Sequence, residues 1–162
     1  MNTAYLILGG NKGNRSENLK NAIETLGKRA GEVLKKSEVY STKAWGNTKQ
    51  PDFLNQVICL RTFLTARELL NMALAIEESL GRVRTEQKWT ERTMDIDILY
   101  YNDEIINTAD LKIPHPYIKD RKFVLIPLAE IAKEFIHPVT GNSTEKMLKE
   151  CNDNLEVWLY NP

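Results

Sequence analysis

Two aspartates in an apolar stretch, Asp95 and Asp97, have the residue type and spacing best suited to metal chemistry. They lie in the run from Met94 to Tyr101, whose composition predicts a strand. Because side chains alternate along a strand that rises about 3.3 Å per residue, both carboxylates should share one face, with Cα atoms roughly 6.6 Å apart. Mg²⁺ suits such a pair, since it takes oxygen ligands and shares carboxylates with substrate phosphates. The pair alone is also compatible with a solvated strand face.

A basic segment without apolar periodicity precedes this strand, from residue 81 to residue 92, and is typical of a loop. Arginine presents a planar fork of donors that fits phosphate oxygens, so its three arginines beside a carboxylate pair indicate a polyphosphate clamp. Such a loop could close over a nucleotide and expel water. The alternative is a solvated loop whose arginines pair with Glu86 and Glu91. The cations and the tryptophan of this segment are Arg82, Arg84, Lys88, Trp89 and Arg92.

A phenyl ring and an amide, Phe53 and Asn55, indicate a place for a flat heterocycle. They stand two residues apart in a predicted strand and should therefore face the same side. The amide offers donors and an acceptor to a heterocyclic amide edge, and the ring offers a stacking face. Trp45 and Phe123 could complete this pocket. The alternative is a core phenylalanine followed by a turn asparagine.

Two prolines hold His115 in an extended context, and three cations including Arg121 follow shortly after it. The histidine could be a further phosphate donor, although a lone histidine is also compatible with a structural role. The glycine-rich run from Gly9 to Gly13 matches neither the Walker A spacing nor the dinucleotide fingerprint. Nucleotide binding therefore cannot depend on a P-loop.

The elements that must position these residues follow from apolar periodicity. Strands are predicted over residues 4–8, 34–41, 53–64 and 94–101, and helices over 19–30 and 66–80, the second opened by a Thr65/Glu68 capping box and closed by Gly81. This order predicts an α+β, ferredoxin-like (βαββαβ) antiparallel sheet with both helices on one face. C-terminal pieces, including an apolar segment at 123–131 and a helix at 143–151, should cover the second face.

Composition limits the possible partners. The 162 residues suit a single domain spanning 1–162, and 22 basic against 22 acidic residues leave no net field to attract nucleic acid or anionic lipid. No apolar run approaches the length of a membrane span, and we expect no leader before the first strand. With only two cysteines, Cys59 and Cys151, we expect a soluble protein of the reducing cytoplasm.

Across most of its length the chain resembles the 6-hydroxymethyl-7,8-dihydropterin pyrophosphokinase family of folate biosynthesis. No single motif is decisive, but their order along the chain is specific. The matching stretches are Tyr5–Asn11, Gln50–Asn55, Glu77, Gly81–Arg84, Trp89, Arg92–Leu99, Ile113–Pro116 and Arg121–Leu128.

The resemblance implies a ferredoxin-like enzyme that transfers the β,γ-diphosphate of ATP to the pterin hydroxymethyl oxygen and releases AMP. It implies two Mg²⁺ ions on Asp95 and Asp97, and a monomer whose partners are ATP and the pterin. Arg82 and Arg92 would join the two aspartates as catalytic residues. The implied phosphate-binding residues are Arg82, Arg84, Lys88, Trp89, Arg92, His115 and Arg121. The implied pterin pocket is Thr42, Trp45, Phe53, Asn55 and Phe123.

Three positions depart from the family pattern. Gly10 replaces the usual serine, Lys88 stands where arginine is frequent, and Thr90-Glu91 replaces a Gly-Pro pair. Lysine is a point charge rather than a bidentate fork, so the loop contact should differ. Two rival functions remain: a metal-dependent transferase that uses a nucleotide sugar, and a non-catalytic nucleotide- or pterin-binding module.

Overall fold

The computed structural model describes residues 1–44, 49–81 and 93–162. Its principal feature is a six-stranded sheet in which every strand pair is antiparallel. The strand order is β5-β1-β4-β3-β8, and β2 also pairs with β4. The strands of this sheet are β1 (Asn2–Gly10), β2 (Glu32–Lys36), β3 (Tyr40–Thr42), β4 (Phe53–Thr62), β5 (Asp95–Tyr101) and β8 (Val157–Leu159).

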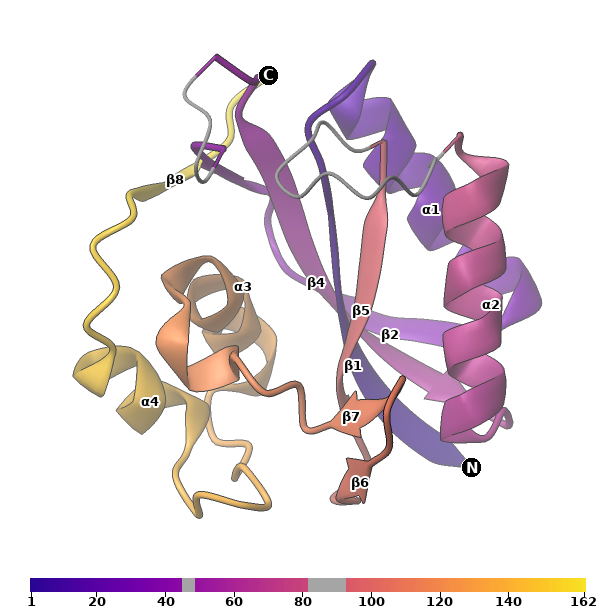
Figure 1. Ribbon diagram of the computed structural model, residues 1–162, viewed down its shortest axis with the longest axis vertical. Helices are drawn as coiled ribbons and strands as arrows, with labels where there is room; N and C mark the ends of the chain where they lie inside the picture. The colour runs from indigo at the N-terminus through magenta and orange to yellow at the C-terminus, as the bar shows by residue number, and fades with distance from the viewer. Residues whose placement is uncertain (45–48, 82–92) are drawn as a thin grey trace.

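Helices cover both faces of this sheet (Figure 1). On one face lie α1 (Arg15–Arg29) and α2 (Ala66–Ser79), and on the other lie α3 (Lys122–Ala132) and α4 (Thr144–Glu150). A short two-stranded sheet of β6 (Ile106–Asn107) and β7 (Lys112–Ile113), and the 3₁₀ helix η1 (Ile118–Asp120), connect β5 to α3. The expected ferredoxin-like arrangement, with C-terminal helices on the second face, is confirmed.

Local signals begin and end the first two helices. Thr65 accepts the N–H of Glu68 at 3.1 Å while the Glu68 carboxylate accepts the N–H of Thr65 at 2.7 Å, which confirms the predicted capping box of α2. Gly81 follows α2 with φ +88°, a conformation that glycine adopts at low cost. Gly31 follows α1, and a Cβ there would collide with the main-chain carbonyl of Arg61.

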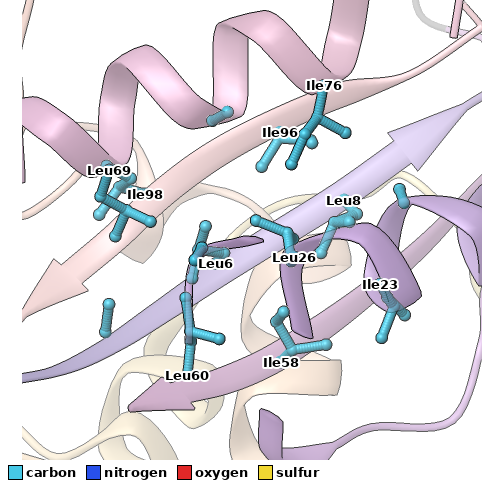
Figure 2. Packing of buried hydrophobic residues seen from close by; sticks show 14 of the residues in the cluster. Leu6, Leu8, Ile23, Leu26, Ile58, Leu60, Leu69, Ile76, Ile96 and Ile98 are labelled. Carbon is cyan, nitrogen blue, oxygen red and sulfur yellow. The ribbon is translucent and has the colours of Figure 1, made fainter. Parts of the chain in front are cut away.

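Alternation along the strands divides the core in two. Leu6, Ile58 and Ile98 point toward α1 and α2, where Leu26 and Ile76 meet them (Figure 2). The intervening residues Ile7, Val57 and Leu99 belong to a second cluster under α3 and α4, together with Val124, Leu125 and Leu128. Each central strand is therefore apolar on both faces, as the sequence predicts for a strand in mid-sheet.

The prediction of one strand over residues 34–41 is wrong, because the chain forms β2 and β3 with a break between them. Ser37 causes the break through hydrogen bonds to β4. Its Oγ accepts the N–H of Val57 at 3.0 Å, and its carbonyl accepts Nε2 of Gln56 at 2.6 Å. The strand predicted over residues 53–64 is β4, and it ends at Thr62 rather than near Leu64. Thr62 Oγ1 turns back there to donate to the Ala30 carbonyl.

Candidate functional site

A cavity of about 480 Å³ opens on the α3 side of the sheet, where β1 and β3 end and β4 and β5 begin. Residues from distant parts of the chain line it. The predicted site residues that it brings together are Thr42, Phe53, Asn55, Asp95, Asp97, His115, Arg121 and Phe123.

The two aspartates lie at the beginning of β5. Asp95, Asp97 and Leu99 line the cavity, while Ile96 and Ile98 pack on the opposite face, so the predicted shared face of the carboxylates is confirmed. Asp97 is exposed and Asp95 half-buried. The buried Glu77 of α2 accepts the N–H of Ile96 at 2.7 Å, which fixes the β5 backbone between the two aspartates.

The carboxylates of the cavity fit a cation that is bound partly by the protein and partly by substrate oxygens, rather than one enclosed by protein ligands. Within residues 1–44, 49–81 and 93–162, no group of three or more His, Cys, Asp or Glu side chains gathers to hold a metal ion. Two carboxylates facing an open cavity suit Mg²⁺, which keeps several waters and completes its shell with substrate oxygens. Asp95 and Asp97 are the residues that would hold it.

A second wall of the cavity is built by β3 and β4. Asn55 and Thr42 are both buried, and the Asn55 Nδ2 donates to Thr42 Oγ1 at 3.3 Å. Thr42 pairs with Phe53 across the strands, so ring, hydroxyl and amide come together at one point of the sheet. Gly9 lies opposite Asn55 on β1, and a Cβ there would collide with the Asn55 Oδ1. Only glycine leaves this amide room beside the β1 backbone.

His115 is held as a neutral hydrogen-bond donor. Its main-chain N–H donates to the Leu99 carbonyl at 3.0 Å, and its Nδ1 accepts the N–H of Tyr117 at 3.3 Å. Burial, assisted by the positive charge of Arg121, lowers the pKa of His115 to about 4. Because Nδ1 is the acceptor, the single ring proton of the neutral imidazole belongs on Nε2.

Arg121 provides positive charge beside the aromatic residues. Its guanidinium carbon lies 4.7 Å from the ring centroid of Tyr117 and 5.7 Å from that of Phe123. These are cation–π distances. Such contacts help to orient a flexible cation, whose N–H groups can still donate to anionic oxygens. The site thus combines acidic, neutral and basic groups around one space.

Six predicted site residues lie outside the described residues: Trp45, Arg82, Arg84, Lys88, Trp89 and Arg92. The predicted clamp therefore stays a prediction. Reasoning from the sequence also missed cavity-lining residues, namely Lys43, Gln50, Asp120, Asp153 and Leu155. It gave Glu77 no role, although a glutamate beside Ala73 and Ile76 on the apolar face of a predicted helix was a usable signal.

None of the helices in the described part of the chain has the length and apolarity that a membrane crossing requires.

Comparison with known proteins finds similar sequences along most of this chain. The family model described as 7,8-dihydro-6-hydroxymethylpterin-pyrophosphokinase (HPPK) matches residues 5–133. A protein of Synechocystis named 2-amino-4-hydroxy-6-hydroxymethyldihydropteridine pyrophosphokinase is 42% identical over 160 residues, which span 98% of this chain and 80% of that protein. A protein of Aquifex aeolicus with the same name is 45% identical over 139 residues, 86% of each chain.

Solved structures agree on the fold. The wild-type HPPK-DHPS of Plasmodium falciparum, crystallised with pteroate, superposes with a TM-score of 0.75 at 16% sequence identity. The match covers 92% of this chain but only 42% of the Plasmodium chain. The family model, the bacterial relatives and the shared fold together establish that this chain belongs to the HPPK family.

Proposed function

We propose that this chain transfers the β,γ-diphosphate of ATP to the hydroxymethyl oxygen of 6-hydroxymethyl-7,8-dihydropterin, giving AMP and the pterin diphosphate in tetrahydrofolate biosynthesis. The observation that carries the proposal is one cavity in which the Asp95/Asp97 pair and the Phe53/Asn55 pair lie on either side of Gly9. A polyphosphate position and a heterocycle position therefore adjoin each other. Residues 1–162 would act as one catalytic domain.

On the acceptor side, the pterin would lie between Phe53 and Phe123, with Thr42 and Asn55 at its amide edge and Trp45 completing the pocket. Stacking of a base on an aromatic ring contributes about 1–3 kcal/mol, a fair guide for a pterin. The Asn55–Thr42 hydrogen bond supports this role, because it orients the amide before the ligand arrives.

On the donor side, Asp95 and Asp97 would hold two Mg²⁺ ions. The chemistry these supply when bound is neutralisation of charge on the phosphate oxygens. His115 would donate its Nε2 proton to a phosphate oxygen as a neutral group, and Arg121 would add positive charge. Arg82, Arg84, Lys88, Trp89 and Arg92 would contribute the remaining phosphate contacts, with Arg82 and Arg92 acting on the transferred group.

No side chain is assigned as a general base. In phosphoryl-type transfer the protein mainly aligns donor and acceptor and stabilises charge in the transition state, which needs no covalent nucleophile. Burial of Thr42 and Asn55 supports the alignment of the acceptor, because these side chains need little rearrangement when the pterin binds.

The decisive experiment incubates the purified chain with Mg-ATP and 6-hydroxymethyl-7,8-dihydropterin and separates the nucleotides by chromatography. We expect AMP and the pterin diphosphate in equal amounts. ADP instead of AMP would contradict diphosphate transfer, and binding of both substrates without turnover would indicate a non-catalytic module. A parallel sample with excess chelator should give no AMP.

We also propose that the enzyme is a monomer of the cytoplasm. The described Cys59 and Cys151 are free thiols, which suits a reducing compartment. Light scattering during gel filtration would test the monomer, and fractionation of the source cells would test the compartment.

A further inference from the structure

The segment that joins α4 to β8 lies along the cavity rather than away from it. Asp153 and Leu155 line the cavity and are half-buried, whereas Asn152, Asn154 and Glu156 are exposed. This alternation is that of an extended chain with one face inward. The segment, yellow in Figure 1, runs past α3 between its two anchors. One anchor is the packing of α4 on α3, and the other is the pairing of β8 with β3.

The Asp153 carboxylate completes the beginning of α3. Its Oδ2 accepts the N–H of Lys122 at 3.0 Å, and its Oδ1 accepts the N–H of Leu155 at 3.0 Å. The helix offers no cap of its own, because the Arg121 side chain makes no capping hydrogen bond and the first turn contains no acidic residue. Asp153 therefore supplies, from 31 residues away, the anionic acceptor that a helix N-terminus favours.

The capped residue stands between two groups of the candidate site. Lys122 is flanked by Arg121 and Phe123, which both line the cavity and approach each other within cation–π distance. The carbonyl of Arg121 also accepts the N–H groups of Val124 and Leu125, each at 3.1 Å. A shift of the Lys122 N–H would therefore displace the whole first turn, and with it the ring and the guanidinium.

We propose that Asp153 is a positioning residue for the proposed function. By holding the N–H of Lys122, it places Phe123 and Arg121 at the cavity, and with Leu155 it makes the C-terminal segment part of the acceptor pocket. This inference rests on the proposed diphosphate transfer. It predicts that loss of Asp153 weakens the pterin position more than the ATP position, since further cations are assigned to the phosphates.

The test compares Asp153→Ala and Asp153→Asn with the control Ser143→Ala. Ser143 caps α4 by accepting the N–H of Lys146 at 3.1 Å, so the control also removes one helix cap, at a site that does not line the main cavity. We expect Asp153→Ala to raise the KM for the pterin about tenfold or more, because small misplacements of contact groups cost this much. The KM for ATP should change less than about threefold. Ser143→Ala should leave both KM values unchanged.

Two further measurements separate positioning from general destabilisation. Asp153→Asn retains one acceptor oxygen and should restore part of the pterin affinity. In a Phe123→Ala background, Asp153→Ala should raise the pterin KM far less than in the wild type, because the ring that it positions is already gone. Equal effects in both backgrounds would overturn the inference, as would equal changes in the two KM values.

The failure of the proposed function would look different. A wild-type chain that neither binds the dihydropterin in calorimetry nor releases AMP would contradict the function itself. A wild-type chain that is active, with Asp153 variants that match it in both KM values, would contradict only the positioning role. If Asp153→Ala does not fold, Asp153→Asn and its combination with Phe123→Ala give the same comparison.

Discussion

The two faces of the sheet are built from the same strands but completed in different ways. Under α1 and α2 the cluster around Leu6, Leu26 and Ile58 fills the space with apolar side chains (Figure 2). Under α3 and α4 the apolar cluster stops near Leu99, and the strand ends beyond it carry aspartates, an amide and the edge of a cavity. One face therefore mainly stabilises the fold, while the other shares its side chains between packing and chemistry.

In the described part of the chain, only the second of these faces borders the cavity of the candidate site. Side chains that line an open cavity have fewer packing partners than side chains in a filled core. The helix beside this cavity, α3, has Pro127 in its interior, and its first turn has neither a side-chain cap from Arg121 nor an acidic residue. Hydrogen bonds to other parts of the chain hold this helix near both of its ends. Asp153 accepts an N–H at its beginning, and near its end the Glu130 carboxylate accepts the Tyr40 hydroxyl and the N–H of Glu38 at 2.8 Å.

The largest expected effect is the loss of turnover in Asp97→Ala, a change at the cavity on the α3 side of the sheet. Asp97 is exposed and fills no core position, so the free energy of unfolding should change by only about 0.5 kcal/mol. Turnover should fall about a thousandfold, because a charge-stabilising contact to the transferred group is lost. AMP release and thermal unfolding would be measured together. Asp103→Ala, an exposed aspartate of the turn after β5, is the matched control and should retain wild-type turnover.

A matched pair of core truncations compares the faces directly. Leu26 and Leu125 are both fully buried, the first in α1 and the second in α3. Each change to alanine should cost about 2–5 kcal/mol in denaturant unfolding. Only Leu125→Ala should also raise the pterin KM, because α3 carries Phe123. A similar increase of the pterin KM in Leu26→Ala, measured where both variants are folded, would contradict the claim that the α1 and α2 face mainly stabilises the fold.

The two histidines give the smallest of these effects. The pKa of His115 is about 4 when folded and near 6.5 when unfolded, so between these values only the unfolded state binds the proton. His115 should therefore lower the free energy of unfolding by about 1–3 kcal/mol as pH drops from 6.5 to 4, and His115→Gln should remove this share of the loss. Chemical denaturation at several pH values would measure it.

His137 provides the control for this experiment. Burial also lowers its pKa, and its Nδ1 accepts the N–H groups of Val139 and Thr140 at 3.1 and 3.2 Å, but it does not line the main cavity. His137→Gln should alter stability alone, whereas His115→Gln should also raise the KM for ATP. An unchanged KM in His115→Gln would argue against a phosphate contact at this ring.

Local patterns predicted much of this molecule because they depend on neighbours in sequence. The helical spacing before Gly81, the Thr65/Glu68 box and the shared face of Asp95 and Asp97 all follow from periodicity within a few residues. The placement of Phe53 and Asn55 at the same cavity follows from the same alternation along a strand.

Local sequence patterns could not predict features that depend on partners distant in the sequence. Ser37 interrupts a strand only because Gln56 and Val57 lie beside it in the fold. Asp153 caps a helix that begins 31 residues earlier in the chain, and Glu77 meets the N–H of Ile96 across a helix–strand contact. In each case a polar group satisfies a main-chain atom that only the folded structure brings near.

The position of Gly9 has a consequence for the geometry of transfer. This residue of β1 pairs with Asn55 on one side and Asp95 on the other. Since neighbouring strands lie about 4.7–4.9 Å apart, the strands that bear the amide and the carboxylate are separated by roughly 10 Å. The interval between the proposed acceptor and donor positions is thus dictated by main-chain hydrogen bonding. Side-chain replacements can weaken either position, but the gap between them belongs to the sheet itself.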